Sequence, residues 1–139
     1  MYPTKEQILK KPVLFKKEAV DAVLNWKAEY YKDGKWQAGN KNDAINMLIK
    51  KLADVYNSPV NISMEPGAWS CYQQEDVTII LDSQQPSILT ALHEFGHHLK
   101  GSSELQACRW SVWLFIKCFP KSYEKLAWRD HMLVKKDGP

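Results

Sequence analysis

Cysteine is scarce in this sequence of 139 residues, and the three that occur, Cys71, Cys108 and Cys118, are unevenly spaced. The pattern excludes a dense disulfide framework and contains no Cys-x-x-Cys pair of the kind that holds structural zinc. The first residues, MYPTKEQILKKP, also lack the apolar core of a secretory signal. An odd number of thiols without such a signal is typical of the reducing cytoplasm, so we expect free thiols and a cytoplasmic location.

Long apolar runs, internal repeats and low-complexity segments are also missing. The longest mainly apolar stretch, residues 110–116, is much shorter than the ~18 residues that suggest a membrane span. Apolar residues make up 45% of the chain and charged residues 25%, close to the globular average. Six Trp, six Tyr and four Phe supply the bulk of a hydrophobic core. We therefore expect a single soluble domain over residues 1–139, with no membrane partner.

Neither sign of charge dominates, because the formal net charge is only +3. The distribution is uneven: residues 1–51 contain 11 Lys against 6 acidic residues, whereas the remainder is slightly acidic. Most of these lysines lie on predicted helices, where a solvated helix face is the simplest interpretation. A docking surface for an acidic partner is the alternative. Nucleic acid is the less favoured partner, because the net charge is too small to indicate it.

The periodicity of apolar residues predicts helices on either side of a short run of strands. Predicted helices cover residues 4–11, 16–31, 42–56, 86–100, 103–118 and 121–132, with a loop over 32–40. Predicted strands cover residues 60–64, 68–73 and 77–81, separated by turn residues. The short turns favour a small, three-stranded, largely antiparallel sheet, and the element order is that of an α+β fold.

The residues with the clearest chemistry form an HExxH sequence at positions 93–97, within a predicted helix. His93 and His97 lie about 40° apart on the same helix face, one turn from each other, so both imidazoles can reach one ion. Glu94 lies about 100° from His93, where it can reach a water molecule beside the ion. Apolar side chains fall on the opposite face of the helix. The pattern favours a catalytic zinc site over a surface helix with solvated histidines.

A catalytic zinc ion needs three protein ligands and an open position. The metzincin pattern does not supply the third ligand, because Lys100 and Ser103 stand where it requires Gly and His. Glu104 follows His97 by seven residues, beyond a helix break at Gly101, and a helix that doubles back could bring its carboxylate to the ion. Stabilisation of a helix N-terminus is the alternative role of Glu104. The other candidate third ligands are His98, Asp82, Glu124 and His131.

The segment LTALHEFGHHLKGSSELQACRWSVWLFIKCFP resembles the core of the ImmA/IrrE-type zinc metallopeptidases of bacteria, phages and mobile elements. In that family an HExxH helix is followed by a helix with Glu, an Ala shortly after it, and an apolar stretch that ends near Pro. Glu104, Ala107, Leu114 and Pro120 occupy these places, and the match covers roughly residues 45–120.

The resemblance implies a minimal zincin-like domain that binds one Zn²⁺ ion in a gluzincin-like site. His93, His97 and Glu104 would be the zinc ligands and Glu94 the catalytic base. The implied activity is that of an endopeptidase that cuts a cytoplasmic protein, such as a transcriptional repressor or regulator. Analogy with related folds also places the substrate beside an edge strand close in sequence to the HExxH helix, with residues 82–85 shaping the cleft.

Several choices stay open at this point. Tyr72, Tyr123 and His131 are candidates for a group that stabilises the transition state, and spacing does not choose among them. The alternatives to a regulatory endopeptidase are an inactive zinc-binding interaction module, a DNA-associated metalloprotease and a peptidase acting on small peptides or cell wall. The predicted elements use nearly the whole chain, so we expect control and target to come from other chains. The sequence does not indicate the oligomeric state.

Overall fold

The computed structural model describes residues 2–37, 39–130 and 132–136 and belongs to the α+β class, as predicted. The helices are α1 (Lys5–Leu9), α2 (Lys17–Tyr30), α3 (Lys41–Val55), α4 (Ile88–Lys100), α5 (Glu104–Cys118) and α6 (Pro120–Glu124). The strands are β1 (Tyr31–Lys32), β2 (Lys35–Trp36), β3 (Asn61–Glu65), β4 (Cys71–Gln73), β5 (Thr78–Asp82), β6 (Leu126–Arg129) and β7 (Met132–Lys135). No helix in these described ranges is long and apolar enough to cross a bilayer.

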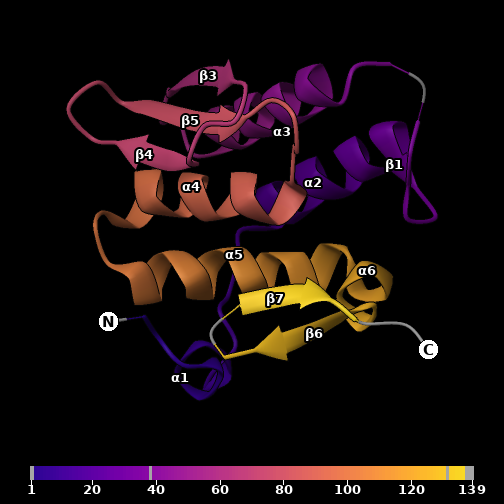
Figure 1. Ribbon diagram of the computed structural model, residues 1–139, viewed down its shortest axis with the longest axis vertical. Coiled ribbons are helices and arrows are strands. Elements are labelled where there is room, and N and C mark those ends of the chain that lie inside the picture. The colour runs from indigo at the N-terminus through magenta and orange to yellow at the C-terminus, as the bar shows by residue number, and fades with distance from the viewer. Residues whose placement is uncertain (1, 38, 131, 137–139) are drawn as a thin grey trace.

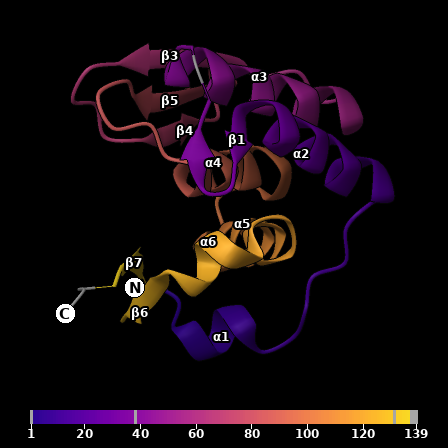
Figure 2. The same cartoon turned by 90° about the vertical axis from the view of Figure 1, so that its right-hand side faces the viewer.

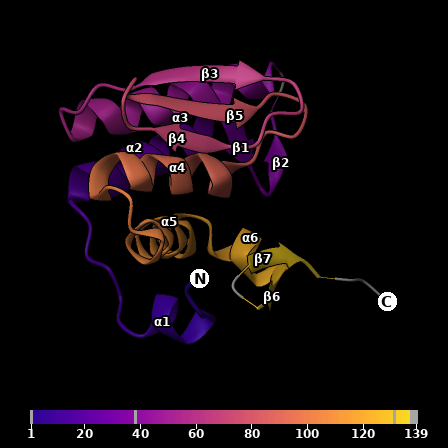
Figure 3. The same cartoon turned by 60° about the vertical axis from the view of Figure 1, so that its left-hand side comes forward.

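Helices α4 and α5 run side by side in opposite directions through the middle of the molecule (Figure 1). The sheet of β3, β4 and β5 lies on the α4 side, whereas α1 lies on the far side of α5 (Figures 2 and 3). The hydrophobic core joins α2, α3, β5, α4 and α5, with Trp26, Phe95 and Phe119 as its largest fully buried side chains. Consequently the two central helices are held from both sides, which fixes their relative position.

The N-terminal helix is fastened to α5 by side chains of α5. Arg109 donates to the backbone carbonyls of Gln7, Ile8 and Lys11, and the indole N–H of Trp113 donates to Ile8. These hydrogen bonds satisfy carbonyls at the C-terminal end of α1 that have no partner within such a short helix.

The three-stranded sheet is mixed, which corrects the predicted largely antiparallel sheet. Its order is β3-β5-β4: β4 pairs with β5 in the antiparallel sense, but β3 pairs with β5 in parallel, from Asn61 opposite Thr78 to Glu65 opposite Asp82. The chain therefore crosses from one edge to the other between β3 and β4. Strand β5 takes the centre because its apolar residues are the most deeply buried, with Ile79 0% and Leu81 3% exposed.

Two hairpins differ from the prediction. The helix predicted over residues 121–132 is correct only as far as Glu124, where α6 ends; beyond it, β6 and β7 form an antiparallel hairpin. Asp130 has a φ of 58° in the turn between them, a conformation that Asp tolerates better than most residues. A second hairpin, β1–β2, occupies part of the predicted loop over 32–40, with Asp33 and Gly34 at positive φ in its turn.

The ends of the helices follow the predicted signals closely. Thr4 and Gln7 form a reciprocal capping box at α1, and the Ser103 side chain accepts from the Gln106 N–H at the start of α5. At α4 the cap is Ser87, so Pro86 lies just before the cap and not at the first helical position. Gly101 ends α4 with a φ of +86°, a value that glycine adopts without a steric cost.

Candidate metal centre

Three side chains converge where α4 meets the start of α5. The Glu104 Oε1 atom lies 2.6 Å from His93 Nε2 and 3.2 Å from His97 Nε2. The two imidazole rings are 4.9 Å apart between centroids and nearly perpendicular to each other. All three side chains are partly exposed, so the cluster lies at the surface end of the α4–α5 contact and can be reached from solvent.

The close approach of the two helices brings Glu104 to the histidines. A Cβ atom added at Gly96 would lie 3.0 Å from the Ala107 carbonyl oxygen and 3.2 Å from its Cα, so only glycine fits here without displacement. The Gly101 N–H donates to the His97 carbonyl at 2.8 Å and closes the last turn of α4. Two residues later the Ser103 cap starts α5, which makes Glu104 its first residue. The carboxylate is therefore placed by backbone geometry on both sides of the turn.

The hydrogen bonds of His97 define which of its nitrogens can bind a cation. Its Nδ1 lies 2.9 Å from the Gly101 carbonyl oxygen, which can only accept, so Nδ1 carries the hydrogen. In the neutral ring the lone pair is then on Nε2, which faces the Glu104 carboxylate. A lone pair and an ionised carboxylate at 3.2 Å repel each other unless a proton or a cation lies between them. The donor set therefore fits a metal ion, because it offers imidazole nitrogens and a carboxylate oxygen at one point.

His93 is also suited to the neutral form. Burial lowers the pKa of His93, and His97 acts in the same direction, although Glu104 acts to raise it. Its Nδ1 lies 3.8 Å from the Sγ of Cys108, a sulfur contact on the side of the ring away from Glu104. Cys108 was not among the predicted site residues. Its position one helical turn after Glu104 on α5 is the signal that could have indicated it.

Glu94 is the acidic residue of the site that burial affects most. Glu94 is 6% exposed, and its pKa is raised to about 7, mainly by burial; His97 opposes the rise and Glu104 adds to it. A ligand atom of Glu94 lies within 4.8 Å of those of His93 and His97, and the same holds for the trio His93, Glu104 and Cys108, so either trio could hold a metal ion. The sequence pattern placed Glu94 beside the histidines but did not indicate its burial.

An open cavity of about 470 Å³ lies over this cluster. Its walls come from the edge strand β4, from α4 and from the α4–α5 turn, and the N-terminal segment contributes Tyr2. The lining residues are Tyr2, Ser70, Cys71, Tyr72, Gln74, His93, Glu94, His97, Gly101, Ser102 and Glu104. Residues 82–85, which we expected to shape the cleft, are not among them. The edge strand at the site is β4, because β5, the strand nearest in sequence to α4, is central.

His98 lies away from the metal cluster, among residues of the sheet side. Its Nε2 is 3.0 Å from the Ser58 carbonyl oxygen and therefore carries the hydrogen, and its Nδ1 is 2.9 Å from the Tyr72 hydroxyl. In the neutral ring Nδ1 accepts, so the Tyr72 hydroxyl donates to it. Tyr72 thus lines the cavity with its hydroxyl hydrogen donated to His98, and its oxygen can still accept a hydrogen bond.

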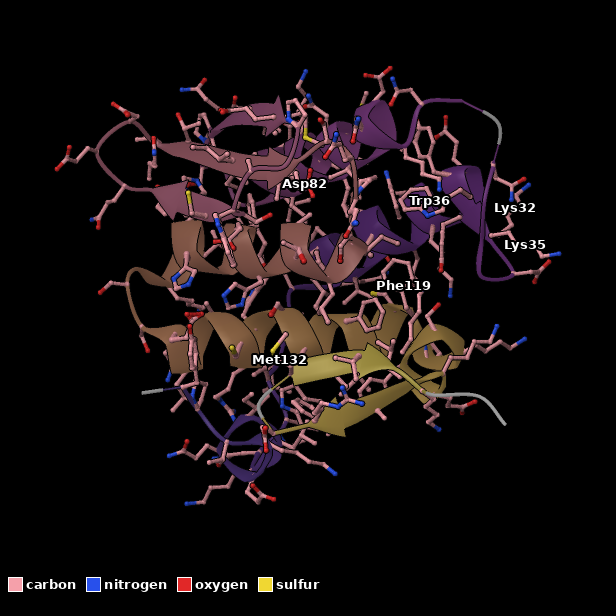
Figure 4. All side chains as sticks on the ribbon, in the orientation of Figure 1. Lys32, Lys35, Trp36, Asp82, Phe119 and Met132 are labelled. Carbon is pink, nitrogen blue, oxygen red and sulfur yellow. The ribbon has the colours of Figure 1, made fainter. Side chains whose placement is uncertain are left out.

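The remaining predicted site residues lie elsewhere. Asp82, at the end of β5 (Figure 4), accepts from the backbone N–H groups of Gly67 and Gln84. Tyr123 and Glu124 lie on α6, beyond the C-terminal end of α5, and the Tyr123 hydroxyl accepts from the indole N–H of Trp128. Neither lines the cavity over the histidines. His131 is outside the residues that the structure describes.

No protein-family model, no curated protein and no solved structure matches this chain.

Proposed function

We propose that this protein is a zinc-dependent endopeptidase with a zincin-like site of the ImmA/IrrE type. The observation that carries the proposal is the convergence of His93, His97 and Glu104 on one point, directly beside a buried Glu94 and beneath an open cavity. Two imidazoles and one carboxylate are the protein ligands of several catalytic zinc sites, and they leave a position open for water.

The roles of the side chains follow from their positions. His93, His97 and Glu104 hold the metal, and the hydrogen bond from His97 to the Gly101 carbonyl orients its ring. Zinc, when bound, supplies a Lewis acid that polarises a carbonyl oxygen and lowers the pKa of water toward ~7. Glu94 accepts a proton from the attacking water and delivers it to the nitrogen of the leaving amine. Burial raises the pKa of Glu94 in the metal-free protein, whereas a bound cation would favour its ionised form, the form that accepts a proton.

The substrate would lie extended along β4. One edge of this strand pairs with β5, and within the described sheet its other edge has no strand partner. A peptide placed there can form backbone hydrogen bonds with β4 while one of its carbonyl groups reaches the cluster. Tyr72 would assist by accepting a substrate N–H, since its own hydrogen is donated to His98. The sequence resemblance favours a cytoplasmic regulatory protein, such as a repressor, as the source of that peptide.

Cleavage of a mixture of defined synthetic peptides, followed by mass spectrometry, tests the proposal. The zinc-loaded protein should generate new N-termini, and the Glu94→Gln variant should do so about 10²- to 10⁴-fold more slowly. Zinc content measured on both proteins is the control, because the substitution leaves all three proposed ligands in place. Equal cleavage by the two proteins would exclude Glu94 as the base. Stoichiometric zinc without any cleavage would instead indicate a non-catalytic interaction module.

A further inference from the structure

A second cavity, of about 740 Å³, lies at the opposite end of α4 from the metal centre. Its walls are the β1–β2 hairpin, the start of α4 and the C-terminal part formed by α6, β6 and β7. Leu89, which lines this cavity, and His93, which lines the other, are four positions apart on α4, or about 6 Å along the helix axis. No described residue lines both cavities, so the two are distinct.

The charged residues that line this second cavity are all lysines: Lys41, Lys125, Lys135 and Lys136. Among the described residues, none of the four forms an ion pair with a carboxylate. These lysines come from walls of the cavity that face one another. The β1–β2 turn lies close to Lys125, since a Cβ added at Gly34 in that turn would be 3.5 Å from Lys125 Nζ. Lys32 and Lys35 extend from the outer side of the same hairpin (Figure 4). The cavity is therefore positive, although Asp33 and Glu124 lie nearby in sequence.

The remaining lining is mainly apolar. It includes Trp36, Ile88, Leu89, Phe115, Leu126 and Leu133. A ligand that complements this surface needs an apolar group for the cavity and negative charges for its lysines.

The aromatic rings at this cavity favour a peptide over a nucleic acid. Bases of single-stranded nucleic acids bind by stacking on open aromatic faces. Here Trp36 packs edge-on against Tyr31 at 5.2 Å and against Trp26 at 5.9 Å, and Tyr31 packs against Phe119 at 6.0 Å. Lys41 Nζ also lies over the Trp36 ring, 6.0 Å from its centroid, so this face is already occupied. Side chains of a peptide therefore fit this surface better than stacked bases.

We propose that this cavity docks an acidic segment of a partner protein, with a large apolar side chain in the cavity and flanking Asp or Glu residues on the lysines. The lysines supply charge complementarity, which selects the partner and speeds its association. Because none of the proposed metal ligands lines the cavity, this proposal does not rest on the peptidase activity.

Selection of random linear peptides displayed on phage, with the full-length Glu94→Gln protein as the target, tests the proposal without cleavage of the library. The enriched peptides should combine Asp or Glu with a neighbouring Leu, Phe or Trp. Affinity of the strongest peptide, measured by fluorescence anisotropy, should fall at least about tenfold in the double variant Lys125→Glu, Lys135→Glu and should weaken with added salt.

A second double variant provides a matched control with the same change in net charge. Lys10→Glu, Lys50→Glu alters two exposed lysines that do not line the cavity, so it should bind the peptide nearly as well as the parent protein. All four lysines are exposed, and melting curves verify that both variants fold. Enriched peptides without acidic residues, or equal losses in the two variants, would overturn the proposal. Tight binding of a thymidine oligonucleotide that only the cavity variant loses would replace the peptide with nucleic acid.

Discussion

Glu104 joins the two histidines through one carboxylate oxygen, so the metal centre depends on it more than on any neighbouring acidic residue. We predict that Glu104→Ala lowers zinc affinity by about 100-fold or more. Removing a group that only hydrogen-bonds to a metal ligand already lowers metal affinity by about 10- to 100-fold, and a ligand itself should matter more. Competition with a zinc-binding dye measures this change. Glu124→Ala removes an exposed carboxylate on α6 and should leave the affinity unchanged. An unaltered affinity in Glu104→Ala would remove Glu104 from the ligand set.

The hydroxyl of Tyr72 gives a second prediction at this scale. If it accepts a substrate N–H, Tyr72→Phe should raise KM severalfold and change kcat little, since the lost contact exists before and during the reaction. Steady-state kinetics on a peptide identified by the cleavage assay separates the two constants. A fall in kcat at unchanged KM would mean that Tyr72 instead stabilises the transition state. Tyr123→Phe is the control, because its hydroxyl contacts Trp128 on the C-terminal hairpin.

The sequence predicted which side chains come together at the α4–α5 turn, but not all of their surroundings. Spacing along a helix places His93, Glu94 and His97 on one side. The break at Gly101 allows the next helix to run back and carry Glu104 toward the two histidines. Which third ligand is correct depends on the α4–α5 crossing, a long-range property that spacing does not contain. The same holds for the burial of Glu94 and for the contact between Cys108 and His93, since both arise only when the two helices pack.

At the scale of elements, the spacing between α4 and α5 is set at Gly96. A methyl group there would meet the Ala107 backbone at 3.0 Å, and backbone atoms cannot move aside as a side chain can. We predict that Gly96→Ala lowers the free energy of unfolding by about 1–3 kcal/mol. Zinc affinity should fall as well, because α5 must shift and carry Glu104 with it. Chemical denaturation and the dye competition measure the two effects.

The direction in which Gly96→Ala changes the free energy of unfolding tests the close contact between α4 and α5. Helix propensity alone predicts that Ala in place of Gly stabilises a helix interior by about 1 kcal/mol. A more stable Gly96→Ala protein with normal zinc affinity would therefore contradict the close-contact account of the helix pair.

Helices and strands were predicted correctly where the local sequence signals are strong. The prediction failed where the structure depends on which strands pair with each other. The capping residues Thr4 and Ser103 and the helical apolar spacing predicted α1 to α5 closely. Alternation of apolar and polar residues predicted β3 and β5 as strands but contains no information on their parallel pairing. Residues 126–135 contain many good helix formers, but the turn at Asp130 and the pairing of β6 with β7 prevail over that propensity.

For the whole molecule, the proposed metal ligands come from two helices that meet only in the folded state. Zinc should therefore bind the native protein and stabilise it, by about 2.7 kcal/mol when free zinc is 100 times its Kd. Thermal unfolding with added zinc and with a chelator measures the difference. The stabilisation should disappear in the Glu104→Ala protein, and equal melting temperatures in zinc and chelator would contradict a metal site that spans α4 and α5.

The two ends of α4 give the molecule two surfaces of different character. The metal centre lies at its C-terminal end under a cavity whose charged lining residues are glutamates and histidines, and the lysine cavity lies at its N-terminal end. The excess of lysine in residues 1–51 predicted a basic surface in part, since Lys41 lines the cavity. The other three are Lys125 at the C-terminal cap of α6, Lys135 at the end of β7 and Lys136 just after it, and only the fold brings them beside Lys41.

A crystal structure of the zinc-loaded protein, with diffraction data on both sides of the zinc absorption edge, tests the central claim most directly. We predict one anomalous peak at about 2.0–2.2 Å from His93 Nε2, His97 Nε2 and a Glu104 oxygen, with the remaining position open toward the cavity that Glu94 lines. A peak held by other residues, or a Glu104 carboxylate turned away from both histidines, would contradict it.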